Sequence, residues 1–160
     1  MKWIRRILRR PEPSALDIEL ADWRIVEAVL PSTRQAAVFR LRIRKPRIDN
    51  LKAFRFAMKV LWPYDGVMPT PEVNEQQTTF DVALDELTGD NGYAELVRVA
   101  TGNGLKEWLF YATDPEVFGE NFNRLLSSHP QYPVTVEFEE DPEWQEWSSF
   151  VLSVADKTAL

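Results

Sequence analysis

The 160-residue chain contains no cysteine and a single histidine, His129. The lack of cysteine excludes disulfides, thiolate nucleophiles, iron–sulfur clusters and every cysteine-based zinc site. A Ser-His nucleophile pair would need His129 itself, and the sequence has no G-x-S-x-G motif. His129 precedes Pro130 in a polar stretch, which is typical of a loop residue after a helix. We therefore expect no catalytic residues, no metal ligands and no cofactor.

Glycine is scarce, with six residues that form neither the phosphate-binding motif G-x-x-x-x-G-K-[ST] nor the dinucleotide motif G-x-G-x-x-G. The one glycine-dense point is the stretch 102–104, Gly-Asn-Gly, which predicts a tight hairpin turn. Acidic residues gather at 137–143, but the calcium-loop spacing with its central glycine is missing there. We interpret this acidic stretch as a solvated edge of the fold.

Long apolar runs are also lacking, and none approaches the length of about 20 residues that a membrane-spanning helix needs. Residues 1–10 place four apolar side chains on one helical face with arginines beside them. This basic segment predicts either an arm that packs on its own domain or an anchor at a membrane surface. Two prolines follow within 11–14, so we divide the chain into an arm and linker over 1–15 and a single domain over 16–160.

Charges of opposite sign are concentrated in different parts of the chain. Residues 1–59 carry 15 Lys and Arg against 6 Asp and Glu, whereas residues 60–160 carry 4 against 19. The acidic part would repel phosphate groups, so we expect no nucleic-acid partner. The two parts either neutralise each other in the fold or present a basic face to an acidic partner.

Three stretches are predicted as strands, and the last two of them alternate between apolar and polar residues, as half-buried strands do. They span 23–30, 36–44 and 53–62, and the first two predict an N-terminal β-hairpin. In the third stretch, Lys59 occupies one of the polar positions. The candidate partner-binding face consists of four arginines at polar positions of these strands: Arg40, Arg42, Arg44 and Arg55.

Two helix starts have the same plan, in which an N-cap acceptor is followed by a proline and an acidic residue. They lie at 70–72 (Thr-Pro-Glu) and at 114–116 (Asp-Pro-Glu), and each follows a strand-like stretch. A last alternating strand spans 133–140. Residues 53–140 therefore have the order β-α-β-β-α-β, which predicts an α+β fold of the ferredoxin-like split βαβ sandwich type. We expect a mostly antiparallel sheet with two helices on one face, extended by the N-terminal β-hairpin.

The split βαβ topology places the last strand beside the first strand of the unit. Glu137 and Glu139 then become neighbours of Arg55 and Lys59 on the open sheet face. Opposite charges in such positions stabilise a sheet by about 0.2–1 kcal/mol per pair. The apolar residues of the last strand that we expect to face inward are Val134, Val136 and Phe138.

Three segments carry a resemblance to a known family. The first is 64–76, which runs from Tyr-Asp-Gly to the Asn-Glu-Gln of the helix start. The second is 101–111 (TGNGLKEWLFY). The third is 132–144, which runs from Tyr-Pro-Val to Asp-Pro-Glu-Trp. In order and spacing they resemble the bacterial domain-of-unknown-function family 695 over roughly residues 22–152. The resemblance implies a small α+β sandwich and brings no established activity. The residues that we take as a motif surface are Tyr64, Asp65, Gly66, Glu72 and Glu75.

The topology and the Tyr-Asp-Gly turn are also similar, more distantly, to the bacterial protein regulators of ribonuclease E. This similarity lies at the level of the fold and carries no residue roles to this chain.

The missing nucleophile and phosphate motifs favour a non-enzymatic cytoplasmic module that binds or regulates another protein. Two alternatives stay open. One is a hydrolase-type enzyme with a carboxylate site near Tyr64, Asp65 and Glu72, to which Glu75 and Tyr111 would contribute. The other is a module held at a membrane surface by its basic N-terminal arm.

Overall fold

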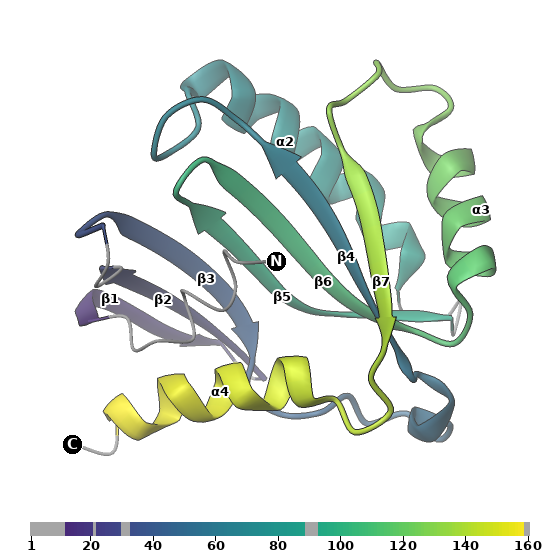
Figure 1. Ribbon diagram of the computed structural model, residues 1–160, viewed down its shortest axis with the longest axis horizontal. Helices are drawn as coiled ribbons and strands as arrows, with labels where there is room; N and C mark the ends of the chain where they lie inside the picture. Colours follow the sequence, from purple (N-terminus) through teal and green to yellow (C-terminus); the bar gives the residue numbers. More distant parts are fainter. Residues whose placement is uncertain (1–11, 21, 30–32, 89–92, 159–160) are drawn as a thin grey trace.

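Seven strands form one antiparallel sheet in the computed structural model, which describes residues 12–20, 22–29, 33–88 and 93–158 (Figure 1). Their order across the sheet is β1-β2-β3-β5-β6-β4-β7. The strands are β1 (Glu12–Leu20), β2 (Trp23–Val29), β3 (Ala36–Arg42), β4 (Phe56–Pro63), β5 (Ala94–Gly102), β6 (Leu105–Ala112) and β7 (Thr135–Glu140). The helices are α2 (Pro71–Leu84), α3 (Pro115–Leu126) and α4 (Gln145–Thr158), with short 3₁₀ helices η1 (Leu51–Ala53) and η2 (Asp85–Leu87). The predicted α+β class with an antiparallel sheet is confirmed.

The predicted N-terminal hairpin is formed by β2 and β3, and β3 joins it to the central strands by pairing with β5. A further strand, β1, pairs with β2 at the outer edge. The linker predicted at 11–14 is therefore wrong from Glu12 onward. The prolines hid this strand, because proline is excluded from central strands but is accepted at a sheet edge. The predicted basic arm at 1–10 lies outside the described residues.

The helices α2 and α3 cover one face of the central strands. Each begins at its predicted cap, since Thr70 Oγ1 accepts a hydrogen bond from Val73 N at 3.3 Å and Asp114 Oδ1 accepts one from Glu116 N at 2.8 Å. The buried side chains packed between these helices and the sheet include Met58, Val60, Trp62, Phe80, Leu84, Trp108, Phe110, Phe118 and Phe122. Two helices thus share one face, as the sequence predicts.

The last strand lies beside the first strand of the central unit, as expected. β7 pairs with β4, and Glu137 is the direct neighbour of Lys59. Arg55 forms an ion pair with Glu140, and Lys59 Nζ lies 3.6 Å from Glu139 Oε1. The predicted neutralisation of the basic strand by the acidic strand is therefore present in the sheet.

Two apolar residues of β7 differ from the prediction. Val134, just before the strand, packs against the core under α3. Val136 and Phe138, which we expected to face inward, are 37% and 60% exposed. Because β7 is the outermost strand on this side, only one neighbouring strand shields its side chains.

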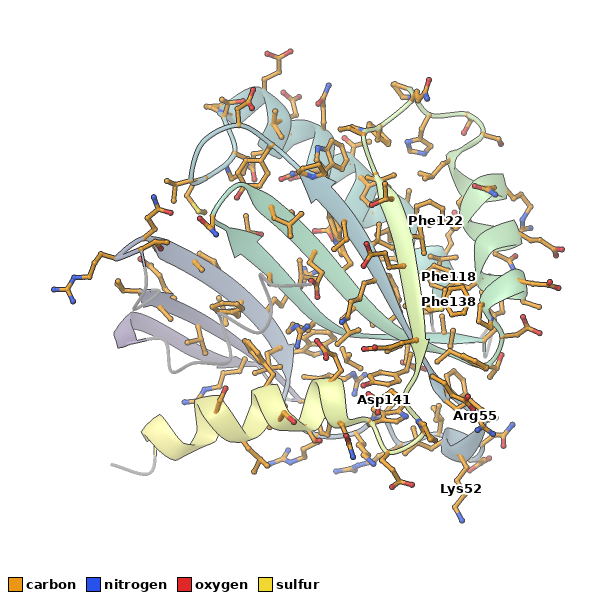
Figure 2. The ribbon with its side chains drawn as sticks, viewed as in Figure 1. Lys52, Arg55, Phe118, Phe122, Phe138 and Asp141 are labelled. Carbon is orange, nitrogen blue, oxygen red and sulfur yellow. The ribbon has the colours of Figure 1, made fainter. Side chains whose placement is uncertain are left out.

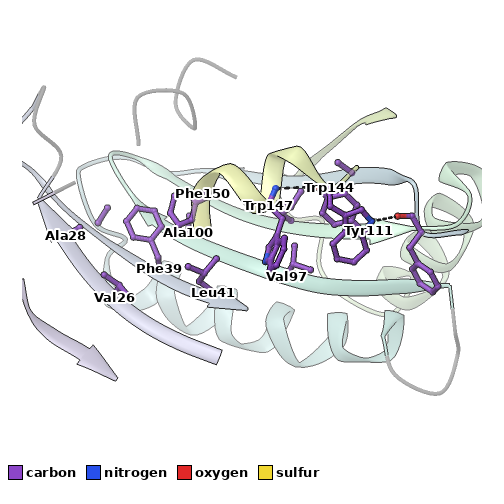
Figure 3. Close-up of a cluster of buried hydrophobic side chains, with 14 residues drawn as sticks. Val26, Ala28, Phe39, Leu41, Val97, Ala100, Tyr111, Trp144, Trp147 and Phe150 are labelled. Atoms are coloured by element: carbon purple, nitrogen blue, oxygen red, sulfur yellow. Dashed lines mark hydrogen bonds between the residues drawn. The ribbon is translucent and has the colours of Figure 1, made fainter. Parts of the chain in front are cut away.

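The opposite face of the sheet is not open, because α4 crosses it (Figures 1 and 3). The side chains that pack between α4 and the strands include Val26, Ala28, Phe39, Leu41, Val97, Leu109, Tyr111, Trp144, Trp147 and Phe150. Lys59, which was expected on an open face, is only 2% exposed as a result. The aromatic tail thus forms a third helix that the two-helix interpretation lacks.

A single carboxylate joins β7 to α4. Asp141 Oδ2 accepts hydrogen bonds from the Tyr111 hydroxyl at 2.6 Å and from Glu146 N at 2.9 Å, and Oδ1 accepts one from Gln145 N at 2.9 Å. The ring of Trp144 stacks on Tyr111, with 4.0 Å between centroids and 6° between planes. Burial, together with the bond to Asp141, raises the pKa of Tyr111 well above its usual range. Tyr111 therefore acts as a hydrogen-bond donor to this junction.

The predicted turn at 102–104 connects β5 and β6. Asn103 has φ 54° and Gly104 has φ 78°, and positive values at both central positions define the type I′ turn of two-residue hairpins. Gly102 has a different role, because a Cβ at this position would lie 2.7 Å from Cβ of Ala37 on β3. The missing side chain of Gly102 allows β3 to approach the central hairpin.

This close approach predicts that Gly102→Ala lowers the free energy of unfolding by about 1–3 kcal/mol, the usual cost of overpacking. Gly119→Ala is the matched control, because Gly119 lies within α3 and a Cβ there meets no atom within 4 Å. We expect the control to raise stability by up to about 1 kcal/mol through helix propensity. Urea unfolding of both variants measures the difference, and equal changes would contradict the packing of β3 on Gly102.

Candidate functional site

The four candidate arginines do not share one face of the sheet. Arg40 and Arg42 alternate along β3 with side chains that pack under α4, so they lie on the face that carries α2. Arg44 lies beyond the end of β3 in an exposed ion pair. Arg55 precedes β4, which is separated from β3 by two strands, and it pairs with Glu140 of β7 (Figure 2). The structure thus brings together only Arg40 and Arg42.

These two arginines surround a tryptophan of the neighbouring strand. Trp23 of β2 is the direct neighbour of Arg42 in the sheet. The guanidinium carbon Cζ of Arg42 lies 5.5 Å from a Trp23 ring centroid, and that of Arg40 lies at 6.0 Å. Each such cation–π contact stabilises by about 0.5–1 kcal/mol when it is exposed to solvent. We term Trp23, Arg40 and Arg42 the arginine–tryptophan face.

The arginine–tryptophan face is accessible and retains hydrogen-bond donors. In Figure 1, α2 lies behind the central strands, and among the described elements no helix lies behind β2 and β3. The side chain of Arg40 is 44% exposed, and Trp23 is half-buried. The Nε atom of Arg42 is buried, and no described residue accepts its hydrogen bond.

One acidic residue of α2 borders the face. Asp81 Oδ1 lies 3.5 Å from Arg40 Nη2 and accepts a hydrogen bond from Trp108 Nε1 at 2.5 Å. Lys106 Nζ lies 3.8 Å from Asp81 Oδ2 and 5.1 Å from a Trp108 ring centroid. Burial lowers the pKa of Lys106, and Asp81 partly offsets this effect. Arg40 and Lys106 therefore flank the carboxylate of Asp81, and the charge of Arg42 acts on the Glu95 carboxyl, where it opposes the rise in pKa that burial causes.

Beneath α4 lies a second group of charged residues, which the sequence analysis did not identify. A bulge between Leu96 and Arg98 directs the Arg98 side chain toward α4. Arg98 Nη2 lies 2.9 Å from Glu107 Oε1 and 3.4 Å from Glu146 Oε1. Lys59 Nζ lies 3.2 Å from the same Glu146 oxygen. We term Lys59, Arg98, Glu107 and Glu146 the buried ionic cluster.

The buried ionic cluster is shielded from solvent, since the side chains of Arg98 and Glu107 are each 1% exposed. Burial raises the pKa of the Glu107 carboxyl, and the charge of Arg98 opposes this rise. Its charges pair with one another across β4, β5, β6 and α4, so we interpret the cluster as structural. The alternation of β4 indicated the side of the sheet on which Lys59 lies, but not the helix that covers it.

The turn that follows β4 holds part of the motif surface. The Tyr64 hydroxyl donates a hydrogen bond to Val67 O at 2.9 Å, and burial raises the pKa of Tyr64 to about 12. Gly66 has φ 87°, a conformation that favours glycine. The carboxylate of Asp65 is exposed beside it. Tyr64 and Gly66 therefore stabilise the turn.

The remaining motif residues lie elsewhere. Glu72 and Glu75 are exposed on α2 and line a hollow of about 340 Å³ with His129 and Tyr132. Tyr111 lies at the other end of β6 from this turn. At the rise per residue of an extended strand, the separation is about 20 Å. The structure therefore does not bring Tyr111 together with the residues of the carboxylate-site alternative.

Within the part of the chain that the structure describes, no three His, Asp or Glu side chains are grouped so as to hold a metal ion. No helix in that part combines the length and the apolar character needed to cross a bilayer.

Comparison with known proteins identifies a family but no individual relative. No curated protein and no solved structure matches the chain. The similarity to protein regulators of ribonuclease E therefore stays a prediction. A family model described as "Family of unknown function (DUF695)" matches residues 22–152, which include the arginine–tryptophan face and the buried ionic cluster. Because the match covers most of the sequence, as the three motif segments predict, the chain belongs to the family of unknown function DUF695.

Proposed function

We propose that the chain is a non-enzymatic module that binds another protein through the arginine–tryptophan face. The main observation behind this proposal is the position of Trp23 beside two guanidinium groups, on a part of the sheet that no described helix covers. Tryptophan and arginine are the residues that most often dominate the binding energy of protein interfaces. Trp23 offers apolar area, and Arg40 and Arg42 offer donors of fixed geometry.

The charge of the face supports an acidic partner. Arg40 and Lys106 share the carboxylate of Asp81, and the side chain of Arg40 is 44% exposed. A carboxylate of the partner would accept hydrogen bonds from the exposed guanidinium of Arg40 and neutralise part of its charge. We therefore propose that the bound segment contains Asp or Glu beside an apolar residue that contacts Trp23.

We also propose that the central unit is of the ferredoxin-like split βαβ type. Its four strands have the spatial order β7-β4-β6-β5, and α2 and α3 each connect two strands that are separated by a third. This order, with the last strand beside the first, supports the predicted topology. The β1–β3 extension is an addition to this unit, and it supplies the arginine–tryptophan face.

Affinity purification of the tagged full chain from its host tests the proposed function. We expect a partner in stoichiometric amount with the wild type, and at least about tenfold less with Arg40→Glu, because one hot-spot arginine contributes about 1.4 kcal/mol or more. The matched control is Arg124→Glu, which reverses the charge of an exposed arginine on α3. We expect this control to recover the partner like the wild type.

Circular dichroism of the purified variants must show that Arg40→Glu is folded before its loss of binding is interpreted. Equal recovery of a partner by Arg40→Glu and by Arg124→Glu would overturn the proposed surface. Recovery of chaperones alone by the wild type would overturn the proposed function.

A further inference from the structure

The strand β7 is an exposed edge of the sheet. Among the described strands it pairs only with β4, and all six of its residues are exposed. The opposite edge strand, β1, contains Pro13 and an irregular register, two features that hinder the addition of another strand. The sequence of β7, TVEFEE, contains no proline, and its pairing with β4 is regular. Its backbone therefore offers a continuous edge for pairing.

The register identifies which backbone groups face outward. Asp141 N donates a hydrogen bond to Arg55 O at 2.7 Å, so these residues form a hydrogen-bonded pair of the antiparallel ladder. Hydrogen-bonded pairs alternate with non-bonded pairs along such a ladder. The N–H and C=O groups of Val136, Phe138 and Glu140 therefore point away from β4, toward the free edge.

The charges along this edge favour one kind of partner. Glu137, Glu139 and Glu140 lie within six residues, and Glu137 forms no ion pair among the described residues. At the end of β7 a hollow of about 300 Å³ is lined by Glu139, Glu140, Asp141, Gln145, Glu146 and Ser149. A second copy of β7 would place glutamates opposite glutamates, which destabilises a strand pair. A strand with Lys or Arg would instead complement both the edge and the hollow.

We propose that β7 binds an extended, basic segment of another protein by strand addition. The outward N–H and C=O groups of β7 pair with the backbone of that segment, as in other β-augmentation complexes. Apolar residues of the segment cover the exposed side chains of Val136 and Phe138, and one basic residue enters the acidic hollow. This surface is separate from the arginine–tryptophan face, from which it is divided by β5, β6 and β4.

Fluorescence anisotropy tests this proposal with the full chain and a labelled peptide of about ten alternating lysine and valine residues, enough to span the six residues of β7. We expect saturable binding to the wild type. We also expect at least about tenfold weaker binding when the central peptide nitrogens are methylated, because these groups can no longer donate to β7. A glutamate–valine peptide is expected not to bind.

Two substitutions at one position separate backbone pairing from side-chain contact. Val136→Pro removes an outward N–H and leaves the hydrogen bonds to β4, whereas Val136→Ala retains that N–H. We expect at least about tenfold weaker peptide binding by Val136→Pro than by Val136→Ala. Arg40→Glu, which tests the proposed function, is expected to bind the peptide like the wild type, so the two proposals fail independently.

Several results would overturn the proposal. Equal binding of the methylated and unmethylated peptides would show attraction by charge alone. Equal binding by Val136→Pro and Val136→Ala would show that the outward backbone groups are not used. A wild-type dimer in sedimentation that Val136→Pro abolishes would assign the edge to a second copy of the chain. If Val136→Pro does not fold, the methylated peptide decides the question with the wild type.

Discussion

Replacement of Arg98 by methionine is expected to lower the free energy of unfolding by about 3–5 kcal/mol, the usual cost of removing one partner from a buried ion pair. Methionine retains much of the volume beside Phe150, whose ring centroid lies 4.8 Å from Arg98 Cζ. The substitution therefore removes mainly the charge and the hydrogen bond at 2.9 Å to Glu107, which is 1% exposed. Urea unfolding measures the change.

The double variant Arg98→Met/Glu107→Leu is the control. It removes both charges, so we expect it to regain most of the stability that the single variant loses. A double variant as unstable as Arg98→Met would show that packing, and not the unpaired carboxylate, causes the loss.

The loss in Arg98→Met should also depend on pH. Burial raises the folded-state pKa of Glu107, and without Arg98 only the charge of Lys59 opposes the rise. A carboxyl whose pKa is raised on folding favours the folded state below its unfolded pKa and loses that contribution as pH rises through its folded pKa. We therefore expect a smaller destabilisation at about pH 4 than at about pH 8.

Replacement of Trp144 by alanine is expected to cost about 3–5 kcal/mol, as other large-to-small substitutions of buried aromatic residues do. Trp144 is 2% exposed, stacks on Tyr111, and donates a hydrogen bond from Nε1 to Phe54 O at 2.7 Å. Loss of its ring leaves a cavity and an unpaired carbonyl where α4 meets the sheet. Thermal and urea unfolding both report this loss.

Leu152→Ala on α4, the helix that follows Trp144, is the matched control, because Leu152 is 63% exposed. A surface substitution of this kind changes stability by about 0.5 kcal/mol or less. If the two variants lost similar stability, α4 would not pack on the sheet through Trp144.

The elements that the sequence predicts correctly are those with local signals. β3 follows from alternation over its seven residues, and the caps Thr70 and Asp114 lie where α2 and α3 begin. The type I′ turn follows from Asn103 and Gly104, because few residues accept positive φ values. In each case the information lies within a few residues of the element.

The features that the sequence does not predict depend on distant partners. Alternation places Arg40 and Arg55 on the polar side of their own strands. It does not show whether these two polar sides lie on the same face of the sheet, because β5 and β6 lie between β3 and β4. For this reason, the four arginines were grouped on one face. Lys59 is buried only because a helix from the end of the chain covers it, and the burial of Arg98 requires a bulge.

The junction at Asp141 has a consequence for the way in which the fold opens. Its carboxylate accepts hydrogen bonds from the Tyr111 hydroxyl on β6 and from the first two backbone N–H groups of α4. It therefore connects the sheet to the helix. The first amides of a helix otherwise have no partner within the helix. The first turn of α4 cannot move away from β6 without breaking bonds to this carboxylate. We therefore expect the end of β7 and the first turn of α4 to open together as one cooperative unit.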